Sequence, residues 1–158
     1  MTHEFYMNRA LQEAVRAYDE GEVPVGAVIV KDGRVIGKGY NRVEHLSDAT
    51  AHAEIIAIGA ASAALESWRL DNCTLYVTLE PCIMCLGAII QSRIETVVYA
   101  STDPRCGAID TFYFRPEIER TRLRFPTVIP GIMANESSEL LKSFFRTIRN
   151  KDRTHPRS

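Results

Sequence analysis

The sequence predicts a three-layer α/β/α sandwich, in which a central five-stranded mixed sheet lies between two layers of helices. Two observations carry this prediction. Strand-like and helical segments alternate through the middle of the chain, and their short connections imply parallel strand pairing with right-handed crossovers. Near the N-terminus, two strand-like segments flank Asp32-Gly33, a turn signal that predicts an antiparallel hairpin and so makes the sheet mixed.

The elements follow from hydrophobic periodicity, taken in chain order. Apolar residues at helical spacing predict an amphipathic helix over residues 3–20. Two Ala- and Ile-rich segments are apolar almost all round, which predicts buried helices. The expected order is helix 3–20, strands 25–30 and 34–40, helix 51–65, strand 74–78, helix 82–92, strand 96–100, a short strand 125–129 and helix 135–150.

Composition limits the class of protein. The 158 residues are 46% hydrophobic and 25% charged, which suits one globular domain, placed at residues 1–150. The N-terminus shows no secretory signal, and no apolar segment is long enough to span a bilayer. We therefore expect a cytoplasmic protein with no membrane partner, whose four cysteines stay reduced.

The charge is distributed unevenly. The net charge is only −1, but residues 142–158 carry six Lys and Arg against one acid, which gives this end +5 and leaves −6 for the rest. Residues 151–158 are expected to form a basic, flexible C-terminal tail. Such an end can follow nucleic-acid phosphates, although cations also suit the end of a solvated helix, and charge alone favours that second interpretation.

Two short segments predict a metal centre. Thr50-Ala-His-Ala-Glu54 and Glu80-Pro-Cys-Ile-Met-Cys85 supply His52, Cys82 and Cys85, three ligands of the kind that zinc prefers. The two cysteines, three residues apart, share one helix face, and the helix N-terminus favours their thiolate forms. Three protein ligands leave a fourth position for water, which is typical of catalytic rather than structural zinc.

Each segment alone has an ordinary alternative. A lone His-x-Glu is common, and a lone Cys-x-x-Cys can be a redox pair. Among the other cysteines, Cys73 precedes a buried strand and is expected in the core, whereas Cys106 lies in a loop and stays open as a fourth ligand. The conjunction of residue types, order and helix context favours one catalytic zinc ion.

The pattern H-x-E…P-C-x-x-C is the one found in zinc nucleobase deaminases. In that chemistry, hydroxide attacks the ring carbon that bears the amine. Glu54, which is not a ligand, takes a proton from the water, gives it to the neighbouring ring nitrogen, and later helps to protonate the leaving ammonia. Glu80 is expected to cap or orient backbone rather than to carry protons.

Beyond these motifs, nearly the whole chain resembles the bacterial tRNA adenosine deaminases of the cytidine deaminase-like superfamily. The segments that carry the resemblance include Glu22-Val-Pro-Val-Gly-Ala27, Asn41-Arg42, Ser67-Trp-Arg-Leu70, Ser92-Arg93-Ile94 and Leu140-Leu-Lys-Ser-Phe-Phe-Arg146. The resemblance implies a cytidine deaminase-like fold and conversion of adenosine to inosine at the tRNA wobble position. It also implies a homodimer with one Zn²⁺ per subunit that acts on the tRNA anticodon stem-loop.

The same resemblance implies roles for individual residues. Asn41 hydrogen-bonds the flipped base, and Val25 lines its pocket. Asp103 contacts the sugar of a flanking nucleotide. Phe145 and Arg146 shape the RNA groove, which makes a phosphate-tracking role for the basic C-terminal end at least as good an interpretation as a solvated face.

One loop departs from the family pattern. After Asp103-Pro-Arg105 the family usually shows a Gly-containing run that ends in Gly-Ser, whereas this chain has Cys106-Gly-Ala-Ile-Asp-Thr111 followed by Phe112-Tyr-Phe114. Asp110 stands where Gly is typical. The departure leaves the metal chemistry unaffected and keeps a second substrate class open, a free nucleobase or nucleoside such as guanine or cytosine. A third alternative, a zinc-stabilised RNA-binding protein without activity, is opposed by the intact Glu54.

Overall fold

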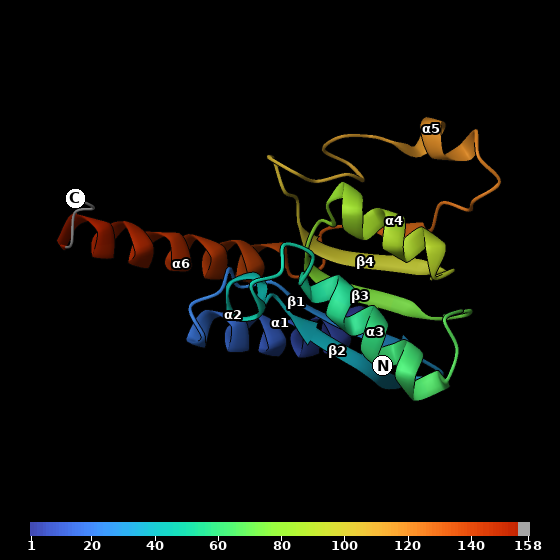
Figure 1. The fold of residues 1–158 in the computed structure, drawn as a ribbon, viewed down its shortest axis with the longest axis horizontal. Helices are drawn as coiled ribbons and strands as arrows, with labels where there is room; N and C mark the ends of the chain where they lie inside the picture. The colour runs from blue at the N-terminus through green and yellow to red at the C-terminus, as the bar shows by residue number, and fades with distance from the viewer. Residues whose placement is uncertain (155–158) are drawn as a thin grey trace.

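A computed structural model describes residues 1–154 and has the predicted α/β/α layers (Figure 1). The helices are α1 (His3–Asp19), α2 (Val43–Leu46), α3 (Ala53–Leu65), α4 (Ile83–Gln91), α5 (Arg115–Glu119) and α6 (Ala134–Thr154). The strands are β1 (Gly26–Lys31), β2 (Arg34–Tyr40), β3 (Thr74–Leu79), β4 (Thr96–Ser101) and β5 (Thr127–Ile129).

The five strands form one mixed sheet in the order β2-β1-β3-β4-β5. The hairpin partners β1 and β2 are antiparallel, and β1 is also antiparallel to β3. The pairs β3–β4 and β4–β5 are parallel. The predicted fold class is therefore confirmed, including the antiparallel hairpin on an otherwise mainly parallel sheet.

Each face of the sheet has its own hydrophobic core. Helices α3 and α4 lie side by side over one face and α1 covers the other, while α6 begins at the sheet and extends beyond it (Figure 1). Under α3 and α4 the core includes Leu75, Val77, Leu86 and Ile89. Under α1 it includes Met7, Val28, Tyr76 and Val98. Among residues 1–154, no helix is both long and apolar enough to cross a bilayer.

Two glycines of β2 let α3 approach the sheet closely. A Cβ on Gly39 would lie 2.3 Å from the carbonyl oxygen of Ala53, and one on Gly37 would lie 2.6 Å from that of Ala57. Both contacts are far shorter than any Cβ can tolerate, so only glycine fits beneath the helix. This close packing fixes the start of α3, and with it His52 and Glu54, at the end of β2.

The structure differs from the sequence expectations at several boundaries. The buried helices begin later than predicted, so that His52 and Cys82 occupy the N-cap positions of α3 and α4. The last strand is shorter than predicted, and the short helices α2 and α5 were not predicted. Helix α6 runs on to Thr154, so residues 151–154 of the predicted flexible tail are helical, with Lys151 and Arg153 favourably placed in the last turn. Residues 155–158 lie outside the described residues.

Candidate active site

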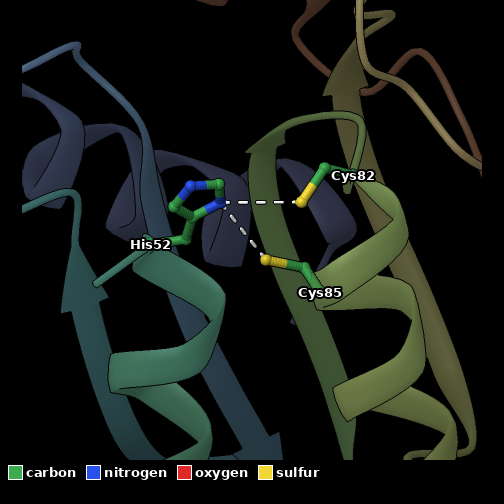
Figure 2. Close-up of side chains that lie close together, drawn as sticks. All are labelled: His52, Cys82 and Cys85. Carbon is green, nitrogen blue, oxygen red and sulfur yellow. Dashed lines mark hydrogen bonds between the residues drawn. The ribbon is translucent and has the colours of Figure 1, made fainter. Parts of the chain in front are cut away.

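Three side chains from the starts of two neighbouring helices converge on one point (Figure 2). The Nδ1 atom of His52 lies 3.6 Å from Sγ of Cys82 and 3.5 Å from Sγ of Cys85. All three donor atoms lie within 4.8 Å of one another. The structure therefore brings together the three residues that the sequence proposed as ligands, from the starts of two helices about 30 residues apart along the chain.

The spacing of these donors suits a tetrahedral zinc ion. With zinc–sulfur and zinc–nitrogen bonds of about 2.3 and 2.0 Å, a tetrahedron puts its sulfur and nitrogen corners about 3.5 Å apart. The separations of 3.5 and 3.6 Å match this value without any rearrangement. One nitrogen and two sulfur donors also form a typical ligand set of catalytic zinc sites.

The electrostatics of the cysteine pair favour a thiolate. Hydrogen bonds from Cys85 and from His52 together lower the pKa of Cys82 to about 4. The hydrogen bond between the two cysteines, together with burial, raises the pKa of Cys85. The hydrogen bond to Cys82 raises the pKa of His52. Even without a metal, the group therefore favours the thiolate form of Cys82.

Glu54 sits in the first turn of α3 and is only 4% exposed. Burial raises the pKa of its carboxyl group, because the charged form loses its hydration. The raised pKa makes the carboxylate a better proton acceptor, which suits general acid–base catalysis.

Two of the donors, His52 and Cys82, line a cavity of about 430 Å³ together with Glu54, and the third donor, Cys85, is fully buried next to them. The size of the cavity lies within the range of small-molecule and nucleotide pockets. The cavity opens where β2 and β3 end and β1 begins, and α6 borders it. The other lining residues come from several parts of the chain: Gly21, Glu22, Val23, Val25, Asn41, Val43, Glu44, Ala53, Leu79, Glu80, Asp103 and Cys106, with Phe144, Phe145 and Ile148 of α6.

Four of the five predicted substrate contacts lie in this cavity, and one does not. Val25, Asn41, Asp103 and Phe145 line it. Arg146 instead lines a separate recess on α6. The reason is helical geometry, since adjacent residues point about 100° apart around the axis, so Phe145 faces the cavity while Arg146 turns away from it.

Asn41 presents a free acceptor. Its backbone N–H donates to the carbonyl of Val25, and its side-chain Nδ2 lies 3.4 Å from the carbonyl of Val23. Its Oδ1 atom is buried and has no hydrogen-bond partner among residues 1–154. Because a buried acceptor without a partner is costly, this atom is suited to a donor on a bound ligand.

Sequence reasoning missed Glu22, which shapes the wall next to Asn41. Its carboxylate is 1% exposed and accepts hydrogen bonds from the backbone N–H groups of Glu44 and His45 at 3.0 and 3.1 Å. Glu22 therefore satisfies the first turn of α2, a helix too short to be stable alone. The segment Glu22–Ala27 carries the family resemblance. An acid at the start of this otherwise apolar segment was the one sequence feature that could have pointed to a role for Glu22.

The two remaining cysteines have different surroundings. Cys73 is fully buried in the core, as the sequence predicted. Cys106 is exposed and borders the cavity, but it does not belong to the donor group found among residues 1–154.

Known proteins that are similar to this chain include zinc-dependent deaminases, as the geometry of the site suggests. The family profile described as "cytidine and deoxycytidylate deaminase zinc-binding region" matches residues 1–101. The tRNA-specific adenosine deaminase of Aquifex aeolicus is 44% identical over 150 residues, which is 95% of this chain and 98% of that protein.

Two solved structures are similar as well. One comes from a study of A-to-I editing by tRNA:A34 deaminases at the wobble position of transfer RNA; it has a TM-score of 0.81 and 44% identity over 86% of this chain and 98% of that one. The guanine deaminase of Bacillus subtilis has a TM-score of 0.62 and 46% identity, but over 65% of this chain and 66% of that one. The chain therefore belongs to the cytidine and deoxycytidylate deaminase zinc-binding family, and within it to the tRNA-specific adenosine deaminases.

Proposed function

We propose that the protein converts adenosine to inosine at the wobble position of tRNA by zinc-dependent hydrolytic deamination. The observation that carries the proposal is that three zinc-type donors meet at the wall of one cavity, which is also lined by the buried carboxyl group of Glu54 and by Asn41 with its free acceptor. The full-length similarity to tRNA-specific adenosine deaminases supports this substrate over the others in the family.

In the proposed site, His52, Cys82 and Cys85 hold one zinc ion. Zinc, when bound, lowers the pKa of water to near neutrality and so supplies a nucleophile. Glu54 takes a proton from the attacking water and delivers it to the ring nitrogen beside the amine-bearing carbon. The carboxylate would then take the second proton, from the hydroxyl group now bound to that carbon, and give it to the departing amine, so that water and adenosine become inosine and ammonia.

The substrate base must leave its stack to enter the cavity. Asn41 Oδ1 accepts a hydrogen bond from the flipped base, and Val25 packs against the ring. Asp103 contacts a neighbouring sugar, and Phe145, 45% exposed at the cavity rim, offers a face for stacking. Beyond the rim, Arg146, Arg149 and Arg153 line one recess on α6, where the RNA backbone would pass.

The proposal includes a homodimer in the cytoplasm. The outer side of α4 is unusually apolar for a surface helix, since Ile83 is 55% exposed and Gly87 and Ala88 lie along the same helix. A second copy would cover this surface. Sedimentation at micromolar concentration should give twice the chain mass, and a monomer would exclude this part of the proposal.

A free nucleobase is the second candidate substrate. The similarity to a guanine deaminase and the unusual Cys106–Phe114 loop favour it. The two candidates separate when the purified protein is incubated with an anticodon stem-loop bearing adenosine, and in parallel with free adenosine, cytidine, cytosine and guanine. Ammonia release from the stem-loop supports the proposal, whereas release only from a free compound rejects it in favour of the second candidate.

A further inference from the structure

The loop from Asp103 to Thr111, here called the 103–111 loop, surrounds a buried carboxylate. Glu80 stands between strand β3 and the ligand Cys82 and is only 2% exposed. Its Oε2 atom accepts the backbone N–H groups of Ile109, Asp110 and Thr111 at 3.0, 2.8 and 3.0 Å. Its Oε1 atom accepts the backbone N–H of Asp103 at 3.1 Å and the hydroxyl of Thr111 at 2.6 Å.

These five hydrogen bonds leave little room for another partner. Both carboxylate oxygens are used within the loop, so Glu80 is not free to serve as a second proton carrier, although it borders the cavity. Charge-assisted bonds of this kind are stronger than neutral ones. The first and last residues of the loop are bound to the same carboxylate, which closes the loop around it.

Gly107 shows how closely the loop fits this carboxylate. A Cβ atom at this position would lie 2.4 Å from both Cδ and Oε1 of Glu80, so no larger residue fits without displacing one of the two. The loop is also joined to the metal-binding segment, since the N–H of Ala108 donates to the carbonyl of Pro81 at 2.9 Å and Gly107 forms a β-bridge with Cys82.

A second contact holds the loop at Asp110, where the sequence departs from the family pattern. The hydroxyl of Tyr99, on β4, donates to the carboxylate of Asp110, the residue that stands where the family usually has glycine. Tyr99 is almost fully buried, whereas Asp110 is exposed, so the contact runs from the core to the outer end of the loop.

We propose that Glu80 is a positioning residue for RNA binding, which holds the 103–111 loop so that Asp103 stays at the wall of the cavity, with Tyr99 and Asp110 as a second tether. The proposal rests on the function proposed above, in which Asp103 contacts a nucleotide beside the wobble base. Glu80 acts through the loop and touches neither the base nor the metal, so its loss should weaken RNA binding more than the chemical step.

The test compares wild type with Glu80→Gln, which replaces an acceptor oxygen by an amide that faces N–H donors. Gly107→Ala disturbs the same contact from the loop side and leaves the carboxylate intact, and Tyr99→Phe removes only the second tether. Glu95→Gln is the matched control, because this exposed glutamate has no side-chain partner among residues 1–154 and loses the same charge. Each protein is assayed for zinc content, for kcat and KM on the anticodon stem-loop, and for hydrogen exchange of residues 103–111 without RNA.

Glu80→Gln and Gly107→Ala should raise KM at least about tenfold while kcat changes less than about threefold and zinc stays at one per chain. Exchange across residues 103–111 should become at least about tenfold faster in both. Tyr99→Phe should give a smaller rise in KM. If the other two variants do not fold, KM and hydrogen exchange of Tyr99→Phe test whether holding the loop supports RNA binding. Unchanged KM, unchanged exchange, or a rise in KM accompanied by zinc loss would overturn the proposal. If the wild type deaminates no RNA, the proposed function fails, while the exchange data still decide whether Glu80 holds the loop.

Discussion

Glu54 differs from Glu22 and Glu80, the other two buried glutamates of the cavity, in its surroundings. Glu22 accepts N–H groups from α2 and Glu80 accepts them from the 103–111 loop, whereas Glu54 is buried beside the donor group and has a raised pKa. The three buried glutamates of the cavity therefore have two kinds of environment. The environment of Glu54 increases the affinity of its carboxylate for a proton, as general acid–base catalysis requires.

Replacing Glu54 by Gln should abolish turnover and preserve the fold. The amide keeps the shape of the side chain but cannot carry a proton, so kcat should fall by at least about a thousandfold, within the range of general acid–base contributions. Zinc content and melting temperature should stay near wild-type values, because the donors are untouched. Near-normal turnover in this variant would show that another group moves the protons.

Removing one donor should remove the metal. Cys85→Ser should lower zinc from about one per chain to nearly none, with loss of activity, because serine is a poor zinc ligand at neutral pH. Cys106→Ser is the matched control: it also replaces a cysteine at the cavity, but it should keep its zinc. Metal analysis of both variants checks the ligand set, and zinc loss from the Cys106 variant would add this residue to it.

At the level of elements, the position of the site depends on how closely α3 lies against β2. Gly37 and Gly39 point toward α3, and the backbone of the helix occupies the space that a Cβ would need. Since His52 and Glu54 stand at the start of this helix, any displacement of α3 moves a ligand and the proton carrier together.

Gly39→Ala should therefore affect both stability and activity. An added methyl group in this contact should lower the free energy of unfolding by about 1–3 kcal/mol or more, and should reduce kcat as well. Lys38→Ala, at the neighbouring exposed position of the same strand, should change stability by less than about 0.5 kcal/mol. Urea unfolding of the two variants makes the comparison, and equal effects would show that the glycine contact does not set the helix position.

The sequence predicted the large elements and the metal ligands because each has a local signal. The hairpin turn at Asp32-Gly33, the apolar helices and the Cys-x-x-Cys spacing are all readable within a few residues. Helix α2 had no such signal, because its first turn is satisfied by Glu22, some twenty residues earlier. The five hydrogen bonds of Glu80 could not be predicted from the sequence either, because they depend on how a loop more than twenty residues away packs against it. The sequence predicted only that Glu80 caps or orients backbone, and its hydrogen bonds to backbone N–H groups confirm this.

On the scale of the whole molecule, positive charge gathers on one helix that leaves the body of the protein. Helix α6 borders the cavity with Phe144 and Phe145 and then continues outward (Figure 1), where Arg146, Arg149 and Arg153 line one recess. Aromatic residues beside the cavity and cations farther out match a nucleic acid whose base enters the site while its backbone follows the helix.

Replacing arginines of this recess by neutral residues should weaken RNA binding, and the loss should be larger at low salt than at high salt. The double variant Arg149→Gln/Arg153→Gln should reduce the slope of log K against log salt by about 1–2, because fewer counterions are released. Arg34→Gln, at the exposed start of β2, removes a charge at the opposite end of that strand from the cavity and should leave the slope unchanged. An unaltered slope in the double variant would show that these arginines do not contact RNA phosphates and are only solvated residues at the end of a helix.

The central claim is that one zinc-dependent site acts on a single adenosine presented by RNA. Its most direct test is to locate inosine by mass spectrometry in a stem-loop that carries adenosine at the wobble position and elsewhere, after incubation with zinc-loaded wild type or Glu54→Gln. We predict inosine at the wobble position alone with wild type and none with the variant. Inosine spread over several adenosines, or no inosine while a free base is deaminated, would contradict the account.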